Sequence, residues 1–105
     1  MRRFAAERDW DQYHSPKNLA MALIVEAGEL VEHFQWLSES QSTALSAAQR
    51  KAVESEIADV LIYLVRLADK LDIDLAVAAT AKMAVNEVRY PADKVRGSAR
   101  KHDEY

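Results

Sequence analysis

Two pairs of acidic residues lie within stretches of this sequence that are otherwise mostly apolar. Glu26 and Glu29 are three residues apart, and so are Glu56 and Asp59. On a helix this spacing places both members of a pair on one face, where like charges repel. Burying such charges is costly unless something compensates them. A hard divalent cation does so, because Mg²⁺ takes oxygen ligands and is commonly held by carboxylates together with substrate phosphates. The two pairs therefore predict a metal site.

Either pair alone has a simpler interpretation, because glutamates at this spacing usually face solvent on an ordinary surface helix. The presence of two pairs, each on a long and mostly apolar stretch, favours the metal site. His14 and His33 are not expected to bind the ion, since magnesium prefers oxygen ligands to imidazole. We assign no role to His33.

Aromatic, amide and basic residues accompany the acids at helical spacing. At about 100° per residue, each acidic pair shares a stripe of the helix surface with other residues. These stripes are Asn18, Ala22, Glu26, Glu29 and Trp36, and Glu56, Asp59, Tyr63 and Arg66. A third stripe consists of Lys82, Asn86 and Arg89. Taken singly, the aromatic residues would be ordinary core residues and the basic ones a solvated face. Together they supply groups for a metal, a base and a triphosphate.

Helices must position these residues, and the sequence predicts four of them. Their expected ranges are about 2–12, 16–37, 46–71 and, after a cap at Asp72 or Asp74, to about 89. Ser15 and Pro16 form a strong start signal, because serine can cap a helix and proline suits its first position. Ser46 and Gln49 fit a capping box, whereas the polar stretch 38–43 is expected to be a connecting loop. The predicted fold is an all-α, four-helix bundle.

The composition bounds the class of protein. The 105 residues suffice for one domain, 1–105, and two glycines and two prolines leave little material for the turns of an all-β fold. The net charge of −3 gives no electrostatic reason to expect a nucleic-acid partner. No apolar run reaches the length of a membrane span, the first residues lack a signal peptide's hydrophobic stretch, and there is no cysteine. A reducing cytoplasm is therefore the expected location, and residues 92–105 are expected to form a basic, flexible tail.

Two segments, 19–25 and 60–67, are apolar around more than one helical face. A helix that is apolar all round must be buried on most sides, and four short helices cannot cover two such segments. A subunit interface would cover them, so we expect a homo-oligomer.

The order of the acids resembles the metal motif of a known family. Glu26-x-x-Glu29, a spacer of 26 residues and Glu56-x-x-Asp59 are similar to the motif of the all-α nucleoside triphosphate pyrophosphohydrolases of the MazG type. Further segments resemble the small single-domain branch of that family, which includes dCTP pyrophosphatases and the MazG-like proteins of bacterial integrons. They are Phe4–Trp10, His14–Leu19, Glu26–Trp36, Asp59–Val65 and Lys82–Pro91. Val25 stands where the family's first motif glutamate lies.

This resemblance implies a role for each group of residues. The Mg²⁺ ligands, with Mn²⁺ as an alternative ion, would be Glu26, Glu29, Glu56 and Asp59. The base and sugar would be lined by Trp10, Trp36, Tyr63 and Asn86. The phosphates would face Lys82, Arg89 and, in the tail, Arg96. Among the acids, Glu29 is the expected general base and Glu26 the second catalytic carboxylate.

The function implied by the resemblance is Mg²⁺-dependent hydrolysis of a nucleoside triphosphate to the monophosphate and pyrophosphate. The expected substrate is dCTP or a modified dCTP, the expected role is house-cleaning of the nucleotide pool, and the expected assembly is a homotetramer of two dimers. Two alternatives stay open. One is a pyrophosphohydrolase of broad base specificity, and the other is a non-catalytic helical oligomer that acts as an interaction module.

Overall fold

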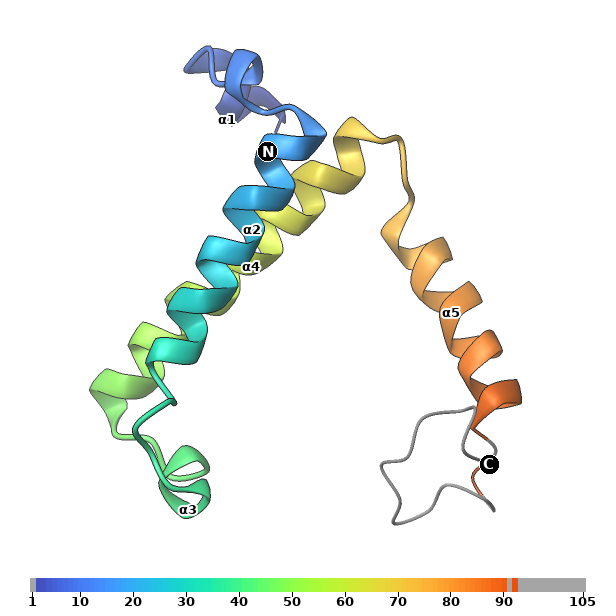
Figure 1. Cartoon of the computed structure of the whole chain (residues 1–105). Helices are drawn as coiled ribbons and strands as arrows, with labels where there is room; N and C mark the ends of the chain where they lie inside the picture. Colours follow the sequence, from blue (N-terminus) through green and yellow to red (C-terminus); the bar gives the residue numbers. More distant parts are fainter. Residues whose placement is uncertain (1, 91, 93–105) are drawn as a thin grey trace. The chain divides into compact units, whose positions relative to one another are not determined.

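The computed structural model describes residues 2–90 and 92, and all regular structure in that part of the chain is helical (Figure 1). The elements are α1 (Arg2–Glu7), the 3₁₀ turn η1 (Asp11–Tyr13), α2 (Pro16–Glu32), α3 (Glu39–Ser42), α4 (Ala47–Lys70) and α5 (Leu75–Arg89). The all-α class is confirmed, although the described residues form five α-helices where four were predicted. The predicted tail, with Arg96, lies outside the described residues except for residue 92. Among the described helices, none combines the length and the apolar composition that crossing a bilayer requires.

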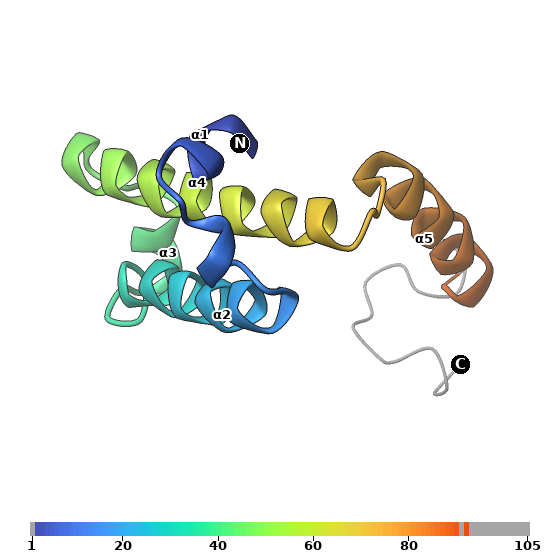
Figure 2. The same cartoon turned by 90° about the horizontal axis from the view of Figure 1, so that it is seen from above.

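The chain forms two units, Met1–Asp72 and Ile73–Tyr105. The first unit is built around α2 and α4, which lie side by side along their length (Figures 1 and 2). Its core is small: the buried apolar side chains of the described chain are those of Ala5, Leu19, Val53 and Ala68. The pairing of α2 with α4 is therefore the relationship that positions the acidic stripes of these two helices.

Side-chain caps mark the helix starts that the sequence indicated. The Ser15 side chain accepts a hydrogen bond from the backbone N–H of Asn18, with Pro16 at the first helical position of α2. Ser46 and Gln49 form the predicted capping box at the start of α4. Each cap satisfies backbone donors that the first turn of a helix leaves free. These two predictions are confirmed.

The boundary between α4 and α5 resolves the choice between two aspartates. Asp74 caps α5, because its side chain accepts from the backbone N–H of Val77 at 3.1 Å. Asp72 instead adopts a left-handed backbone conformation with φ of 53°, just after the last residues of α4. Asp72 therefore ends one helix and Asp74 begins the next.

Two predicted helix ends and one predicted loop are wrong. The first helix ends at Glu7 and not near residue 12, because Asp9 takes a left-handed φ of 53° and the chain then turns into η1. The second helix ends at Glu32 and not at Leu37, because the backbone tightens into bonds of the i→i−3 type, such as Phe34 N–H to Val31 at 2.9 Å. The expected loop 38–43 contains α3, which begins with its own capping box formed by Ser38 and Gln41.

Candidate metal and nucleotide site

Three of the four predicted acids converge between α2 and α4. One carboxylate oxygen from each of Glu26, Glu29 and Glu56 lies within 4.8 Å of the other two. The spacing of three residues puts the two α2 glutamates on one face, and the pairing of the helices brings Glu56 of α4 against that face. All three side chains are partly buried. The structure thus brings oxygens from both acidic pairs together at these three residues, and their role as metal ligands stays a prediction.

Two oxygens of this acidic cluster lack hydrogen-bond partners. Within the described chain, Oε2 of Glu26 and Oε2 of Glu56 are buried and accept no hydrogen bond. A buried polar atom without a partner carries a desolvation penalty, so these two oxygens are available to a ligand. Several carboxylate oxygens close together are the donor set that a hard cation such as Mg²⁺ prefers. The residues present therefore fit a divalent metal.

The electrostatics of the acidic cluster act most strongly on Glu26. Its pKa is raised from 4.5 to about 7, first because burial disfavours the charged form and then through the hydrogen bond and charge of Glu29. The charges of Asp59 and Glu56 raise this pKa further. Asp59 is not among the three residues whose oxygens converge, yet its charge acts on the same carboxyl group. Its role as a fourth ligand stays a prediction.

One neighbour of the acidic cluster had no assigned role. His33 is the C-cap residue of α2, and its Nε2 lies 3.7 Å from Oε1 of Glu56. The sequence could have indicated that His33 lies near the acids, because it follows Glu29 by four residues and residues three or four apart share a helix face. The contact places an imidazole beside Oε1 of Glu56, whereas the oxygen without a hydrogen-bond partner is Oε2.

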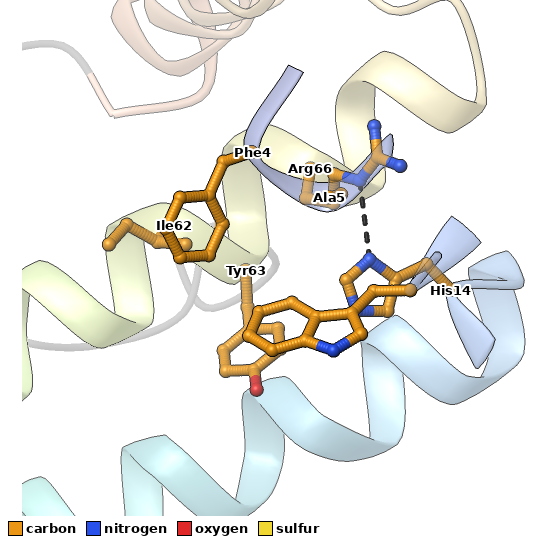
Figure 3. Close-up of a pocket in the computed structure, with 7 residues that line it drawn as sticks. Phe4, Ala5, His14, Ile62, Tyr63 and Arg66 are labelled. Carbon is orange, nitrogen blue, oxygen red and sulfur yellow. Dashed lines mark hydrogen bonds between the residues drawn. The ribbon is translucent and has the colours of Figure 1, made fainter. Parts of the chain in front are cut away.

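An aromatic cavity of about 200 Å³ lies in the same unit (Figure 3). It is lined by Phe4, Ala5, Trp10, His14, Ile62, Tyr63 and Arg66. Trp10 and Tyr63, both predicted to line a base pocket, are thus brought together from distant parts of the sequence. Tyr63 follows Asp59 by four residues, so the cavity begins about one helical turn along α4 from the acids. Flat rings in such a cavity can stack on any nucleobase.

The N-terminal wall of the cavity is held by ring contacts. Phe4 and Trp10 meet edge to face, with centroids 5.4 Å apart, and the rings of Trp10 and His14 lie 6.2 Å apart. The guanidinium of Arg8 covers Phe4 at 3.7 Å from the ring centre. Arg66, from α4, is buried against this wall and donates from Nε to Nδ1 of His14 at 3.3 Å (Figure 3). The sequence placed Arg66 on the stripe of Tyr63 but indicated no role for it.

The remaining predicted residues are Trp36, which follows α2, and three residues of the second unit. Trp36 lies beyond the end of α2 and is 86% exposed, because the helix that would have continued the stripe stops at Glu32. Lys82, Asn86 and Arg89 belong to α5 in the second unit, where Asn86 is half-buried and the two basic residues are exposed. Their contacts with a nucleotide stay predictions.

The fold and the site together define an all-α protein in which two paired helices gather carboxylates next to an aromatic cavity. The chain belongs to the MazG-like family, whose family model matches residues 21–104. The resemblance found in the sequence is therefore confirmed.

Individual relatives agree with this assignment. The chain is 48% identical to human dCTP pyrophosphatase 1 over 103 residues, covering 96% of this chain and 61% of the relative. It is 50% identical to rat dCTP pyrophosphatase 1 over 101 residues, covering 94% of this chain and 59% of the relative. The chain thus spans about three fifths of the length of these relatives. The crystal structure of a pyrophosphatase from Archaeoglobus fulgidus superposes with a TM-score of 0.81 at 44% identity, covering 86% of this chain and 84% of that one.

Proposed function

We propose that this protein hydrolyses a nucleoside triphosphate to the monophosphate and pyrophosphate, with dCTP or a modified dCTP as its preferred substrate. The observation that carries the proposal is the convergence of Glu26, Glu29 and Glu56 within 4.8 Å, with two of their oxygens unpartnered. The names of the mammalian relatives and of the archaeal structure support the reaction class. The role would be house-cleaning of the cytoplasmic nucleotide pool.

The chain's own carboxylates would hold the metal in this proposal. The ligands are Glu26, Glu29, Glu56 and Asp59, the first three from the converging cluster and the last from the same face of α4. When bound, Mg²⁺ or Mn²⁺ neutralises triphosphate charge and lowers the pKa of water. Glu29 accepts the proton of the attacking water, and Glu26 assists as the second catalytic carboxylate.

The rest of the nucleotide would be bound by aromatic and basic side chains. Trp10 and Tyr63 pack against the base in the cavity, with Trp36 as a further aromatic contact. Asn86 of α5 pairs with polar atoms of the base or sugar. Lys82 and Arg89, also of α5, stabilise the charge that develops on the leaving pyrophosphate. The spacing of these three residues at four and three positions gives them one helix face.

The test is pyrophosphate release from a panel of deoxy- and ribonucleoside triphosphates, with and without Mg²⁺. We expect the highest kcat/KM for dCTP or a 5-substituted dCTP, and no release in EDTA. Glu29→Gln should lower kcat by at least about 100-fold, while Glu54→Gln, which changes an exposed acid on α4, should leave it unchanged. Similar turnover of all bases would indicate a broad-specificity enzyme. No release of pyrophosphate from any nucleotide would favour the interaction module.

We also propose that the chain assembles as a homotetramer of two dimers. Large apolar side chains on the helix pair are uncovered in the single chain: Ile24 is 69% exposed, Val25 58%, Ile57 52% and Leu61 56%. An apolar groove between α2 and α4 adds to this surface, and its lining includes Leu23 and Val60. Contiguous apolar surface of this kind is typical of a subunit interface. Light scattering at micromolar concentration should return four times the chain mass, and a monomer would contradict the proposal.

A further inference from the structure

The two carboxylate oxygens of Glu56 lie in different surroundings. Oε2 is buried and has no hydrogen-bond partner within the described chain, whereas Oε1 lies 3.7 Å from Nε2 of His33. Glu56 is one of the three acids whose oxygens converge within 4.8 Å, and its side chain is partly buried. One oxygen is therefore open to a cation, while the other faces an imidazole from α2.

The end of α2 determines where this imidazole lies. His33 is the C-cap residue of the helix, and its backbone N–H donates to the carbonyl oxygens of Leu30 and Val31. The last turn of α2 thus fixes the backbone of His33, and its partly buried side chain reaches α4 at Glu56. Among the described residues, His33 is the one basic side chain with a nitrogen within ion-pair distance of the three converging acids.

This contact joins a hydrogen-bond donor to an acceptor. An ionised carboxylate only accepts hydrogen bonds, so the nitrogen that faces Oε1 has to carry a hydrogen. At 3.7 Å the two atoms are about 0.5 Å beyond the usual range of an N–H···O bond, and small rotations of the two side chains close this gap. A donor at Oε1 fixes the rotation of the carboxyl group and leaves Oε2 free for another ligand.

We propose that His33 is a positioning residue of the metal site, whose imidazole holds Oε1 of Glu56 so that Oε2 is presented to the cation. The proposal rests on the proposed function, since it takes Glu56 as a metal ligand. A glutamate that is fixed before the cation arrives has less rotamer freedom to lose on binding. Hydrogen-bond partners of metal ligands orient those ligands, and their loss weakens metal binding by about 10- to 100-fold. His33 supports the ion without touching it, in keeping with the preference of Mg²⁺ for oxygen ligands.

The first experiment measures Mg²⁺ affinity by calorimetry, with no nucleotide present. His33→Leu removes the donor and should weaken Mg²⁺ binding by about tenfold or more. His33→Gln carries an amide N–H at a similar distance from the backbone and should recover most of the lost affinity. Gln35→Leu, an exposed change just beyond the end of α2, is the matched control and should bind Mg²⁺ as wild type does. Unchanged affinity in His33→Leu, or equal losses in His33→Leu and His33→Gln, overturns the proposal.

The second experiment asks whether His33 acts through Glu56. Urea unfolding in EDTA compares wild type, His33→Leu, Glu56→Gln and the double variant, because a double-mutant cycle isolates a pairwise interaction. His33→Leu should lower the urea midpoint more when Glu56 is present than in the Glu56→Gln background. The corresponding cycle with Glu54→Gln, a change of an exposed acid on α4, should be additive. Additive effects of His33→Leu and Glu56→Gln overturn the proposal.

The third experiment separates positioning from direct contact with the substrate. Pyrophosphate release by His33→Leu should require about tenfold more Mg²⁺ for its half-maximal rate, and at saturating Mg²⁺ its kcat should lie within about twofold of wild type. A kcat that stays low at saturating Mg²⁺ overturns the positioning role. If wild type binds Mg²⁺ but releases no pyrophosphate from any nucleotide, the proposed function fails, whereas the calorimetry and the unfolding cycle still decide the role of His33.

Discussion

A carboxylate oxygen of Glu26 and one of Glu29, one helical turn apart on α2, lie within 4.8 Å of each other. Burial of Glu26, together with the neighbouring Glu29, favours the form of Glu26 that carries its proton and raises the pKa of Glu26 from 4.5 to about 7. Because the folded protein then binds this proton more tightly than the unfolded chain does, Glu26 stabilises the fold fully below pH 4.5. That stabilisation is lost as the pH rises through 7.

The first prediction follows from this loss of stability with rising pH. In EDTA, the melting temperature of wild type should fall relative to that of Glu26→Gln as the pH is raised from 5 to 8, because the glutamine stays neutral. Thermal melts of both proteins across this range measure the difference. The melting temperature of Glu54→Gln should change with pH as that of wild type does. Added Mg²⁺ should reduce the difference at pH 8, since a cation compensates the ionised cluster. Parallel curves for wild type and Glu26→Gln in EDTA would show that the pKa of Glu26 is not raised.

A second prediction concerns the fourth acid, Asp59. Its charge acts on Glu26 although its oxygens are not among the three that converge. If it completes the ligand set, Asp59→Asn should weaken Mg²⁺ binding by about 10- to 100-fold, as the loss of a ligand or of its close support does. The same change should leave the fold intact, because it relieves repulsion between like charges. Calorimetric titration with Mg²⁺ and a thermal melt measure the two effects, and unchanged affinity would exclude Asp59 from the site.

The boundary between α4 and α5 gives a third, structural prediction. Asp72→Gly should raise the free energy of unfolding by roughly 0.5–1 kcal/mol, because a left-handed conformation costs a residue with a side chain more than it costs glycine. Asp74→Ala should lower it by about 1 kcal/mol, since the N-cap bond to Val77 is lost. Urea unfolding measures both changes. Effects of equal sign at the two aspartates would contradict the assigned boundary.

The acidic cluster was predictable because its geometry is local. Spacing of three residues on two long helices fixes which face each acid occupies, and only the pairing of α2 with α4 had to be added. Helix boundaries were harder to predict from the sequence. Ser38 and Gln41 form the same capping box as Ser46 and Gln49, but the polar stretch between residues 38 and 43 has no apolar periodicity, so the short helix there was missed.

The aromatic cavity depends on contacts that a sequence does not reveal. Arg66 bonds to His14 and Asp11 across separations of 52 and 55 residues, and no local pattern distinguishes it from an exposed arginine on a helix. Trp36 was assigned to the acidic stripe by extending α2 too far. The helix ends at Glu32, and the position of this ring therefore depends on the backbone of residues 33–36.

The last prediction concerns base selection by Asn86 of α5. An amide that pairs with the polar edge of a base penalises a base whose donors and acceptors do not match, because the amide is then left unpaired. Asn86→Ala should therefore lower kcat/KM for dCTP and reduce its preference over dATP and dGTP by about tenfold or more. Trp36→Ala should weaken all nucleotides to a similar extent, since stacking tolerates every base. Steady-state kinetics across the nucleotide panel separate the two outcomes, with Thr80→Ala on the exposed surface of α5 as the control. A wild-type preference for a purine triphosphate, or a ratio between bases that Asn86→Ala leaves intact, would remove Asn86 from the base pocket.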